Sequence, residues 1–169
     1  MKNQIQFFKP FHWWYAVIIF VIANLISALP AGFKGDEIVY NSFQQPNVAP
    51  PDWLFPPMWL FLNITSLVAL YIVANSPKQQ PKKQLFLALE MFGWVLFAIF
   101  TTLYFGLNSP ILGAIDTVAG LIVAVASLIC CYSISRKASI LISFRALWLV
   151  LASYVSVYVA LNNVDPFFQ

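Results

Sequence analysis

Three aromatic side chains in a proline-rich segment are the residues of this chain best suited to recognising another molecule. Residues 50–59 read Pro-Pro-Asp-Trp-Leu-Phe-Pro-Pro-Met-Trp, so Trp53, Phe55 and Trp59 project from a segment that four prolines stiffen. Large rings of this kind suit either a membrane–water interface or the wall of a pocket for a flat ligand. The prolines also suit the first turn of a helix that continues into the apolar sequence beyond.

Three ionisable residues, Glu90, Asp116 and Arg145, lie inside long apolar runs. Charge within a membrane is costly, so each raises a functional question. If the runs are helices, Glu90 and Arg145 both lie roughly 10–12 Å from a basic turn. They could form an ion pair, or the arginine could extend to the surface. Asp116 approaches from the opposite side and could brace the helices by accepting from Tyr or Trp donors, or touch a ligand.

The chain offers little for metal or nucleophilic chemistry. His12, the only histidine, begins an apolar run, and the only cysteines, Cys130 and Cys131, are adjacent in another. No Cys-x-x-Cys pair or other zinc-type spacing occurs. We therefore expect no metal site, no catalytic residue and no required cofactor.

Composition and charge indicate a membrane protein. Of the 169 residues, 61% are hydrophobic and 9% are charged, whereas soluble domains carry about 25% charged residues. A soluble domain could not cover so much apolar surface. The net charge of +3 is spread over the ends of the apolar runs, which indicates orientation in a membrane and no nucleic-acid partner.

Five apolar runs are long enough to cross a hydrocarbon layer, which takes about 20 helical residues. We predict spans at residues 12–30, 57–75, 84–106, 109–132 and 139–162, with one long loop at 31–56. Because backbone groups in lipid must be satisfied within each span, the expected fold class is an all-α integral membrane protein. It would be a five-transmembrane-helix bundle in a single domain covering residues 1–169. The first span has features of a signal peptide, but we expect it to be retained.

Basic residues orient the predicted bundle. With an odd number of spans, one side of the membrane receives Lys2, Lys9, Lys78, Lys82, Lys83, Arg136 and Lys137. On the other side, Lys34 is opposed by Asp36, Glu37 and Asp52. The positive-inside rule then places the N-terminus in the cytoplasm and the long loop outside. The membrane would be the inner membrane of a bacterium or an organelle membrane of a eukaryote.

Aromatic and small residues from three spans are expected at one depth, near the outer ends. Those of the fifth span are four residues apart and therefore share one helix face. With the proline-rich loop as a lid, the set could line a pocket; the alternative is ordinary aromatic packing between helices. The candidate ligand-binding residues are Trp53, Phe55, Trp59, Asn63, Phe100, Tyr104, Trp148, Ala152 and Ser156.

Small residues along the fourth span favour self-association. Gly113, Gly120 and Ala124 lie along it, and Gly120 to Ala124 is a small-xxx-small step that permits close helix approach. We predict a homodimer with this span at or near the interface. The alternative is packing within one bundle.

The proline-rich loop resembles the signature segment of the TspO/MBR family, which comprises the tryptophan-rich sensory proteins and the translocator protein, or peripheral-type benzodiazepine receptor. The matching residues are Tyr40, Pro46, Pro50, Pro51, Trp53, Phe55, Pro57 and Trp59. Residues 105–110, Ala114, Asp116, Trp148, Ala152 and 162–163 add support. The resemblance implies a five-helix bundle, often dimeric, with a pocket under the first loop. The implied ligands are tetrapyrroles such as protoporphyrin or haem, aromatic drug-like molecules and, in parts of the family, sterols.

The chain also departs from the family pattern. The replacements are Val48 for Trp, Asn63 for Tyr, Phe100 for Trp with Trp94 displaced, Phe144-Arg145 for Pro-Tyr, and Ser156 for Asn. Val48 matters most, because loop tryptophans are tied to porphyrin photochemistry in bacterial members. A pocket with an altered ligand preference is therefore expected.

Three functions remain open from the sequence. The favoured one is a membrane receptor or transporter-like protein that binds flat hydrophobic ligands. The alternatives are a light-dependent porphyrin-degrading enzyme and a proton-coupled small-molecule carrier that uses Glu90, Asp116 and Arg145. The expected partners are membrane lipid, the hydrophobic ligand and a second copy of the chain.

Overall fold

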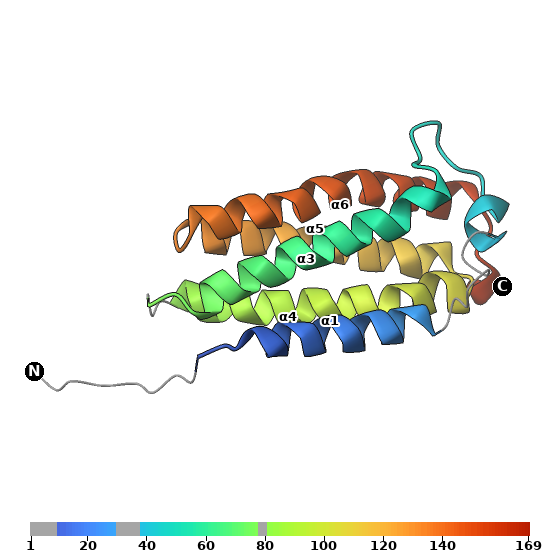
Figure 1. Ribbon diagram of the computed structural model, residues 1–169. Coiled ribbons are helices and arrows are strands. Elements are labelled where there is room, and N and C mark those ends of the chain that lie inside the picture. Colours follow the sequence, from blue (N-terminus) through green and yellow to red (C-terminus); the bar gives the residue numbers. More distant parts are fainter. Residues whose placement is uncertain (1–9, 30–37, 78–80) are drawn as a thin grey trace, which may run out of the picture.

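A computed structural model describes residues 10–29, 38–77 and 81–169, and all regular structure within them is helical (Figure 1). The long helices are α1 (Trp13–Ala28), α3 (Phe55–Ala74), α4 (Pro81–Thr101), α5 (Pro110–Tyr132) and α6 (Arg136–Asn162). Shorter turns are η1 (Asp52–Leu54), η2 (Thr102–Gly106) and η3 (Pro166–Phe168), and residues 38–42 are also helical.

Four helical stretches of the described chain are long and apolar enough to cross a membrane. They are Asp52–Ala74, Pro81–Gly106, Pro110–Tyr132 and Arg136–Asn162, and they correspond to the predicted second to fifth spans. The helix α1 is apolar but has only 16 residues. At 1.5 Å per residue it extends about 24 Å, less than the roughly 30 Å of hydrocarbon. The described chain is thus all-helical, with four helices long and apolar enough to cross a membrane, and helix length alone does not establish the predicted fifth span.

The predicted long loop, residues 31–56, is shorter and more regular than expected. Residues 31–37 lie outside the described residues, 38–42 are helical, and η1 leads directly into α3. Pro56 and Pro57 occupy the first turn of α3, where a helix does not use the backbone N–H groups that proline lacks. The aromatic residues of the segment are therefore carried on helical backbone.

A serine and an aspartate fix the beginning of α5. The hydroxyl of Ser109 accepts a hydrogen bond from the N–H of Leu112 and donates one of 2.7 Å to Oδ2 of Asp165. The same carboxylate oxygen accepts from the N–H of Ile111 at 2.9 Å. Just before the cap, Asn108 has a φ of 51°, a left-handed conformation that Asn tolerates well. These contacts attach the C-terminal segment to the turn between η2 and α5.

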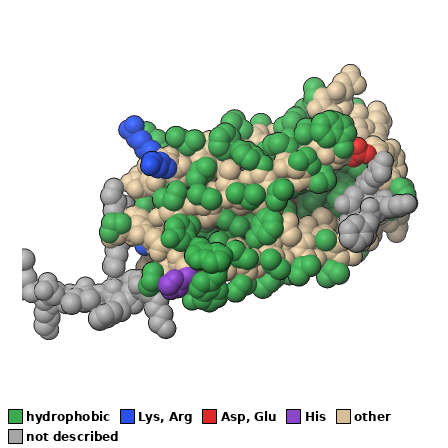
Figure 2. Space-filling model, viewed as in Figure 1, with side chains coloured by type: hydrophobic (Ala, Val, Ile, Leu, Met, Phe, Trp, Pro, Cys, Tyr) green, Lys and Arg blue, Asp and Glu red, His purple; other side chains and the backbone are tan. Residues whose placement is uncertain are grey.

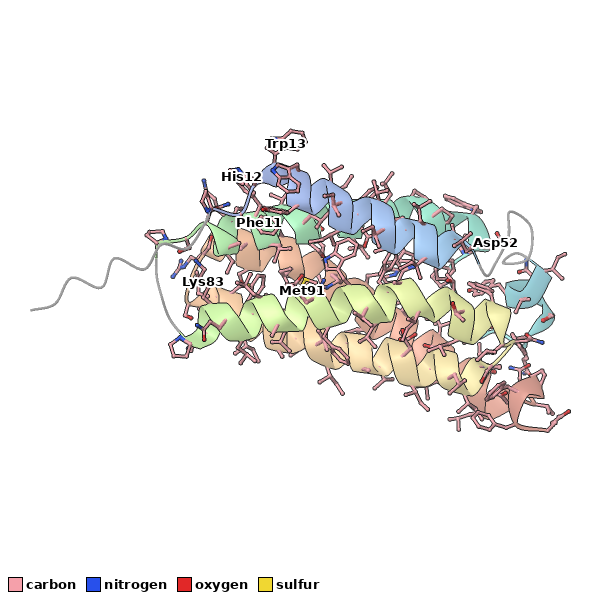
Figure 3. The ribbon with its side chains drawn as sticks, turned by 90° about the horizontal axis from the view of Figure 1, so that it is seen from below. Phe11, His12, Trp13, Asp52, Lys83 and Met91 are labelled. Atoms are coloured by element: carbon pink, nitrogen blue, oxygen red, sulfur yellow. The ribbon has the colours of Figure 1, made fainter. Side chains whose placement is uncertain are left out.

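The helices form a bundle in which α5 packs against α4 and α6, α3 packs against α6, and α1 lies along α4 (Figure 1). Basic side chains gather at the end where α4 and α6 begin, and acidic ones lie at the opposite end (Figure 2). Figure 3 shows Phe11, His12, Trp13 and Lys83 at the first end and Asp52 at the other. The charge asymmetry predicted from the sequence is therefore retained along the bundle axis.

The exterior of the bundle is apolar and several polar groups lie inside. Ile129, Leu147 and Leu161 are 66%, 69% and 79% exposed, whereas Glu90 and Ser127 are fully buried. A soluble protein would hide large apolar residues and expose its carboxylates. This distribution suits a bundle surrounded by lipid.

The half of the bundle near the basic end has a closely packed core. Val73, Phe86, Cys131, Ala138 and Ile142 come from four helices, and each is fully buried. We call this region the closed half. The cavity described below lies in the other half of the bundle.

The small residues of α5 contact their own bundle. A methyl group added at Gly113 would collide with the ring of Tyr104, one added at Gly120 would face Leu149, and Ala124 is fully buried. These contacts favour the alternative of packing within one bundle, and the predicted placement of a dimer interface at or near this span is not tested by them. The homodimer itself stays a prediction.

Candidate functional site

A cavity of about 630 Å³ lies between the helices in the half nearer the loop. We call this region the hollow half. All nine candidate ligand-binding residues line the cavity, and so do Asp116 and Arg145. Figure 2 shows a hollow lined by hydrophobic side chains beside the acidic end of the molecule. Residues that are far apart in the sequence therefore share one space, and binding at that space stays a prediction.

The proline-rich segment and α3 supply one wall. Trp53 is 69% exposed and stands at the rim. Phe55 lies deeper and meets the ring of Trp148 edge-on, with the ring centres 5.8 Å apart. Trp59 packs at 5.3 Å on Phe97 of α4. The helix that begins at the prolines thus turns Phe55 and Trp59 toward the bundle and leaves Trp53 at the mouth of the cavity.

The end of α4 supplies a second wall through a π-helical turn. The N–H of Leu107 donates to the carbonyl of Thr102 at 2.8 Å, the i→i+5 bond of a π turn. Phe100 and Tyr104 are stacked across it, with ring centres 5.6 Å apart. The Tyr104 ring lies against Gly113 of α5, where any side chain would block it. A change of helix type and a glycine together position this pair.

One face of α6 supplies the third wall. Trp148, Ala152 and Ser156 follow one another at four-residue spacing and all line the cavity. The Ser156 hydroxyl donates back to the carbonyl of Ala152, so it is satisfied within its own helix. The small Ala152 side chain leaves open the volume that a larger residue would fill.

A buried ion pair forms the floor of the cavity. Arg145 of α6 donates from its two terminal nitrogens to the two oxygens of Glu90 on α4, at 2.5 and 3.0 Å. It also donates to the hydroxyl of Ser66 on α3 at 3.2 Å. Of the two alternatives left open by the sequence, ion pair or surface arginine, the structure contains the ion pair. Glu90 itself does not line the cavity, because Arg145 lies over it.

Asp116 of α5 is 7% exposed and lines the cavity. Within the described residues, no Tyr or Trp donates to it, and its Oδ1 has no hydrogen-bond partner. The predicted bracing role therefore finds no contact to support it. The same residues include no group of three or more His, Cys, Asp or Glu side chains that could hold a metal ion.

Hydrogen bonds hold the loop over the cavity. The hydroxyl of Tyr40 donates to the carbonyl of Pro50 at 2.8 Å. Asn163, at the end of α6, accepts from the N–H of Gln44 at 2.8 Å and donates to its carbonyl at 3.1 Å. Burial, together with the negative charge of Asp52, raises the pKa of Tyr40 to about 12. The Tyr40 bond thus keeps its donor proton at neutral pH.

Sequence reasoning missed part of the lining. Asn24 and Ser27 of α1 face the cavity, although α1 carried no motif. Trp94 of α4 lines it too, at the position that looked displaced from the family pattern. A signal was available, because Trp94 and Phe97 precede Phe100 at helical spacing. Val48, in contrast, is 58% exposed and is not among the lining residues.

Comparison with known proteins agrees with the loop and the bundle. The model of the TspO/MBR family matches residues 13–161. The tryptophan-rich protein TspO of Chlorobaculum tepidum is 30% identical over 142 residues, which covers 76% of this chain and 85% of that protein. The tryptophan-rich protein TspO of Archaeoglobus fulgidus is 26% identical over 157 residues, covering 86% and 98%. The chain therefore belongs to the TspO/MBR family.

Proposed function

We propose that this protein is a membrane receptor or transporter-like protein that binds flat hydrophobic ligands in the cavity of the hollow half. Tetrapyrroles such as protoporphyrin or haem are the first candidates, followed by sterols and aromatic drug-like molecules. One observation carries the proposal: nine residues chosen for aromatic or small character line a single cavity under the loop.

The size and chemistry of the cavity suit such ligands. Its volume of about 630 Å³ falls within the roughly 300–1,000 Å³ of typical ligand sites. Its walls carry ten aromatic side chains, whose rings gain dispersion and stacking energy from another flat ring system. Most of the exposed lining is apolar, so apolar burial would dominate affinity.

Titration of the purified protein with protoporphyrin or haem tests the proposal. We expect tryptophan emission to fall and saturate at about one ligand per chain. Because Trp13 and Trp14 lie at the basic end, a variant with both changed to Phe should retain most of this quenching. Quenching that grows without saturation, or that vanishes in this variant, would argue against a ligand in the cavity.

A light-dependent enzyme is the second candidate, because Trp59, Trp94 and Trp148 line the cavity and tryptophan is redox-active. Illumination of the bound complex separates the two functions. A receptor leaves the porphyrin absorbance unchanged relative to free porphyrin under the same light. Faster loss in the complex, which is removed by Trp94→Phe and Trp148→Phe, would favour the enzyme. A proton-coupled carrier would instead show uptake that depends on pH.

The proposed topology has five spans, with α1 as the first and the N-terminus in the cytoplasm. It rests on the apolar character of α1, its packing along α4 and the basic residues at that end. Cysteine labelling in intact cells, in a variant with Cys130 and Cys131 changed to Ala, tests it. His12→Cys and Lys137→Cys should both be protected while Val48→Cys reacts. Reaction of His12→Cys from outside would leave only four spans.

The homodimer is proposed on family resemblance alone. Its interface would use an exposed apolar face of the bundle rather than the small residues of α5, which are already packed. Crosslinking in membranes at low protein density would detect it.

A further inference from the structure

Three buried N–H donors, carried by residues that line the cavity, have no partner. They are Nδ2 of Asn63, Nε1 of Trp94 and Nε1 of Trp148, and none is hydrogen-bonded to any described residue. These residues are 5%, 5% and 9% exposed, and all three line the cavity. Buried donors are almost always paired in folded proteins, so three in one cavity call for an explanation.

The three donors lie at one level, directly above the floor. Ser66, Glu90 and Arg145 meet in the hydrogen-bonded contact that closes the cavity. Asn63 lies three residues before Ser66 on α3, Trp148 three after Arg145 on α6, and Trp94 four after Glu90 on α4. Because α3 runs away from the loop and the other two helices run toward it, each donor lies about one turn, roughly 5 Å, nearer the loop.

The side chains at the deep end of the cavity therefore carry unpartnered hydrogen-bond donors. A Trp ring nitrogen can only donate, so neither Trp94 nor Trp148 can satisfy the other. The Glu90 carboxylate below them does not face the cavity, because it is fully buried and paired with Arg145. An occupant that pairs with these groups must bring acceptor atoms of its own.

The end nearer the loop has a different character. The unpartnered polar atoms there are Oδ1 of Asp116 and Oγ1 of Thr101. Both are oxygen atoms, so among the described lining residues the buried, unpartnered N–H donors lie only at the deep end. The two ends of the cavity therefore favour one orientation of a bound ligand. The edge of the ligand that carries acceptor atoms would face the floor.

We propose that Asn63, Trp94 and Trp148 bind carbonyl or carboxylate oxygens of the ligand, which enters with its acceptor-bearing edge toward the Glu90–Arg145 pair. This inference rests on the proposed function and adds the chemical class of the ligand and its orientation.

Three porphyrins that differ only in their acceptors test the inference. Protoporphyrin IX carries two carboxylates, its dimethyl ester carries neutral carbonyls, and etioporphyrin carries alkyl groups alone. The parent protein should bind the acid or the ester about tenfold or more tightly than etioporphyrin, because unpaired buried donors penalise the alkyl compound. Equal affinity for acid and ester would identify carbonyl recognition, and tighter binding of the acid would identify the carboxylate.

Variants locate the effect. Asn63→Leu and Trp94→Phe each remove one donor and keep an apolar side chain, so each should reduce the preference over etioporphyrin about three- to tenfold. Trp13→Phe, at the exposed far end, is the matched control and should change nothing. Asn63→Asp keeps the shape of the side chain but replaces its N–H donors with an acceptor oxygen. It should abolish the preference for acceptor-bearing porphyrins over etioporphyrin, and it serves as the test if the other variants fold poorly.

The outcomes separate this inference from the proposed function. Equal binding of all three porphyrins by the parent, or an unchanged preference in Asn63→Asp, would overturn the inference and leave the receptor intact, with ordered water as the partner of the donors. Failure of every porphyrin to bind would overturn both.

Discussion

The same four helices, α3 to α6, build a closed half and a hollow half. Side chains fill the centre of the closed half, whereas those of the hollow half leave a cavity between the helices. In the closed half, large apolar residues such as Phe86 and Ile142 meet at the centre and are fully buried. In the hollow half, Ala152 and Gly120 stand where larger residues would fill the axis, and the rings line the walls instead. A packed half of this kind can hold the helices in place, so that the other half can remain open.

The Glu90–Arg145 pair marks the boundary between the halves. Charges buried this deeply are stable only when they are paired and hydrogen-bonded. The pair also joins α4 and α6, and through Ser66 it reaches α3. It therefore closes the cavity from below with groups that already satisfy one another.

The largest expected effect comes from breaking this boundary. Glu90→Gln would leave the Arg145 guanidinium buried without a counter-charge, which costs about 3–5 kcal/mol in buried pairs. We expect a large fall in Tm in detergent. The double variant Glu90→Leu with Arg145→Met should recover much of the loss, since it leaves no charge behind. A Tm for Glu90→Gln equal to that of the parent would show that the pair does not hold the halves together.

A pair of matched substitutions on α4 compares the halves directly. Phe86→Ala empties a fully buried site in the closed half and should cost about 3–5 kcal/mol of stability. Phe100→Ala removes a half-buried ring from the cavity wall and should cost about 1 kcal/mol, while weakening porphyrin binding. Thermal denaturation of both variants measures the contrast. Equal losses would mean that the hollow half is packed as tightly as the other.

A glycine supports the wall of the hollow half. Gly113→Ala would force the Tyr104 ring to move, at a cost of about 1–3 kcal/mol. Gly120→Ala, which meets Leu149 only at ordinary contact distance, is the control. We expect a lower Tm in the first variant and an unchanged or higher Tm in the second. An equal fall in Tm in both variants would show that the close packing of Tyr104 against Gly113 is not the cause of the lower stability.

The smallest effect concerns the loop at alkaline pH. The pKa of Tyr40 is raised to about 12, compared with about 10 in an unfolded chain. Its stabilising contribution is therefore fully present below about pH 10 and is lost as the pH rises through about 12. The difference in Tm between the parent and Tyr40→Phe should stay constant to about pH 10 and shrink above it. A difference that shrinks already near pH 8 would contradict the buried, hydrogen-bonded tyrosine.

Much of the hollow half could be predicted from the sequence, because its signals are local. Apolar length gives the long helices, prolines give the beginning of α3, and four-residue spacing gives the lining face of α6. Glu90 and Arg145 lie at about the same distance from the basic ends of their helices, so the sequence also permits an ion pair between them. Apart from the Glu90–Arg145 pair, each of these features depends on residues close together in one segment.

The missing features depend on contacts between segments. The small residues of α5 define a face, but spacing does not tell whether that face meets another copy or the Tyr104 ring. The π turn arises from backbone bonding within η2, and Asn163 holds the loop from more than a hundred residues away. The place of Trp94 on the cavity wall depends on how α4 is rotated against its neighbours, which spacing within α4 does not determine.

The affinity of Ala152→Leu for protoporphyrin tests the central claim most directly. Leucine at this position would fill the cavity beside Trp148 without removing any wall, and we expect binding to weaken more than tenfold while Tm changes little. Ala88→Leu, on an exposed face of α4 outside the cavity, is the matched control and should bind like the parent. If folded Ala152→Leu binds protoporphyrin as tightly as Ala88→Leu does, the ligand does not occupy the hollow half and the aromatic walls serve only to pack the helices.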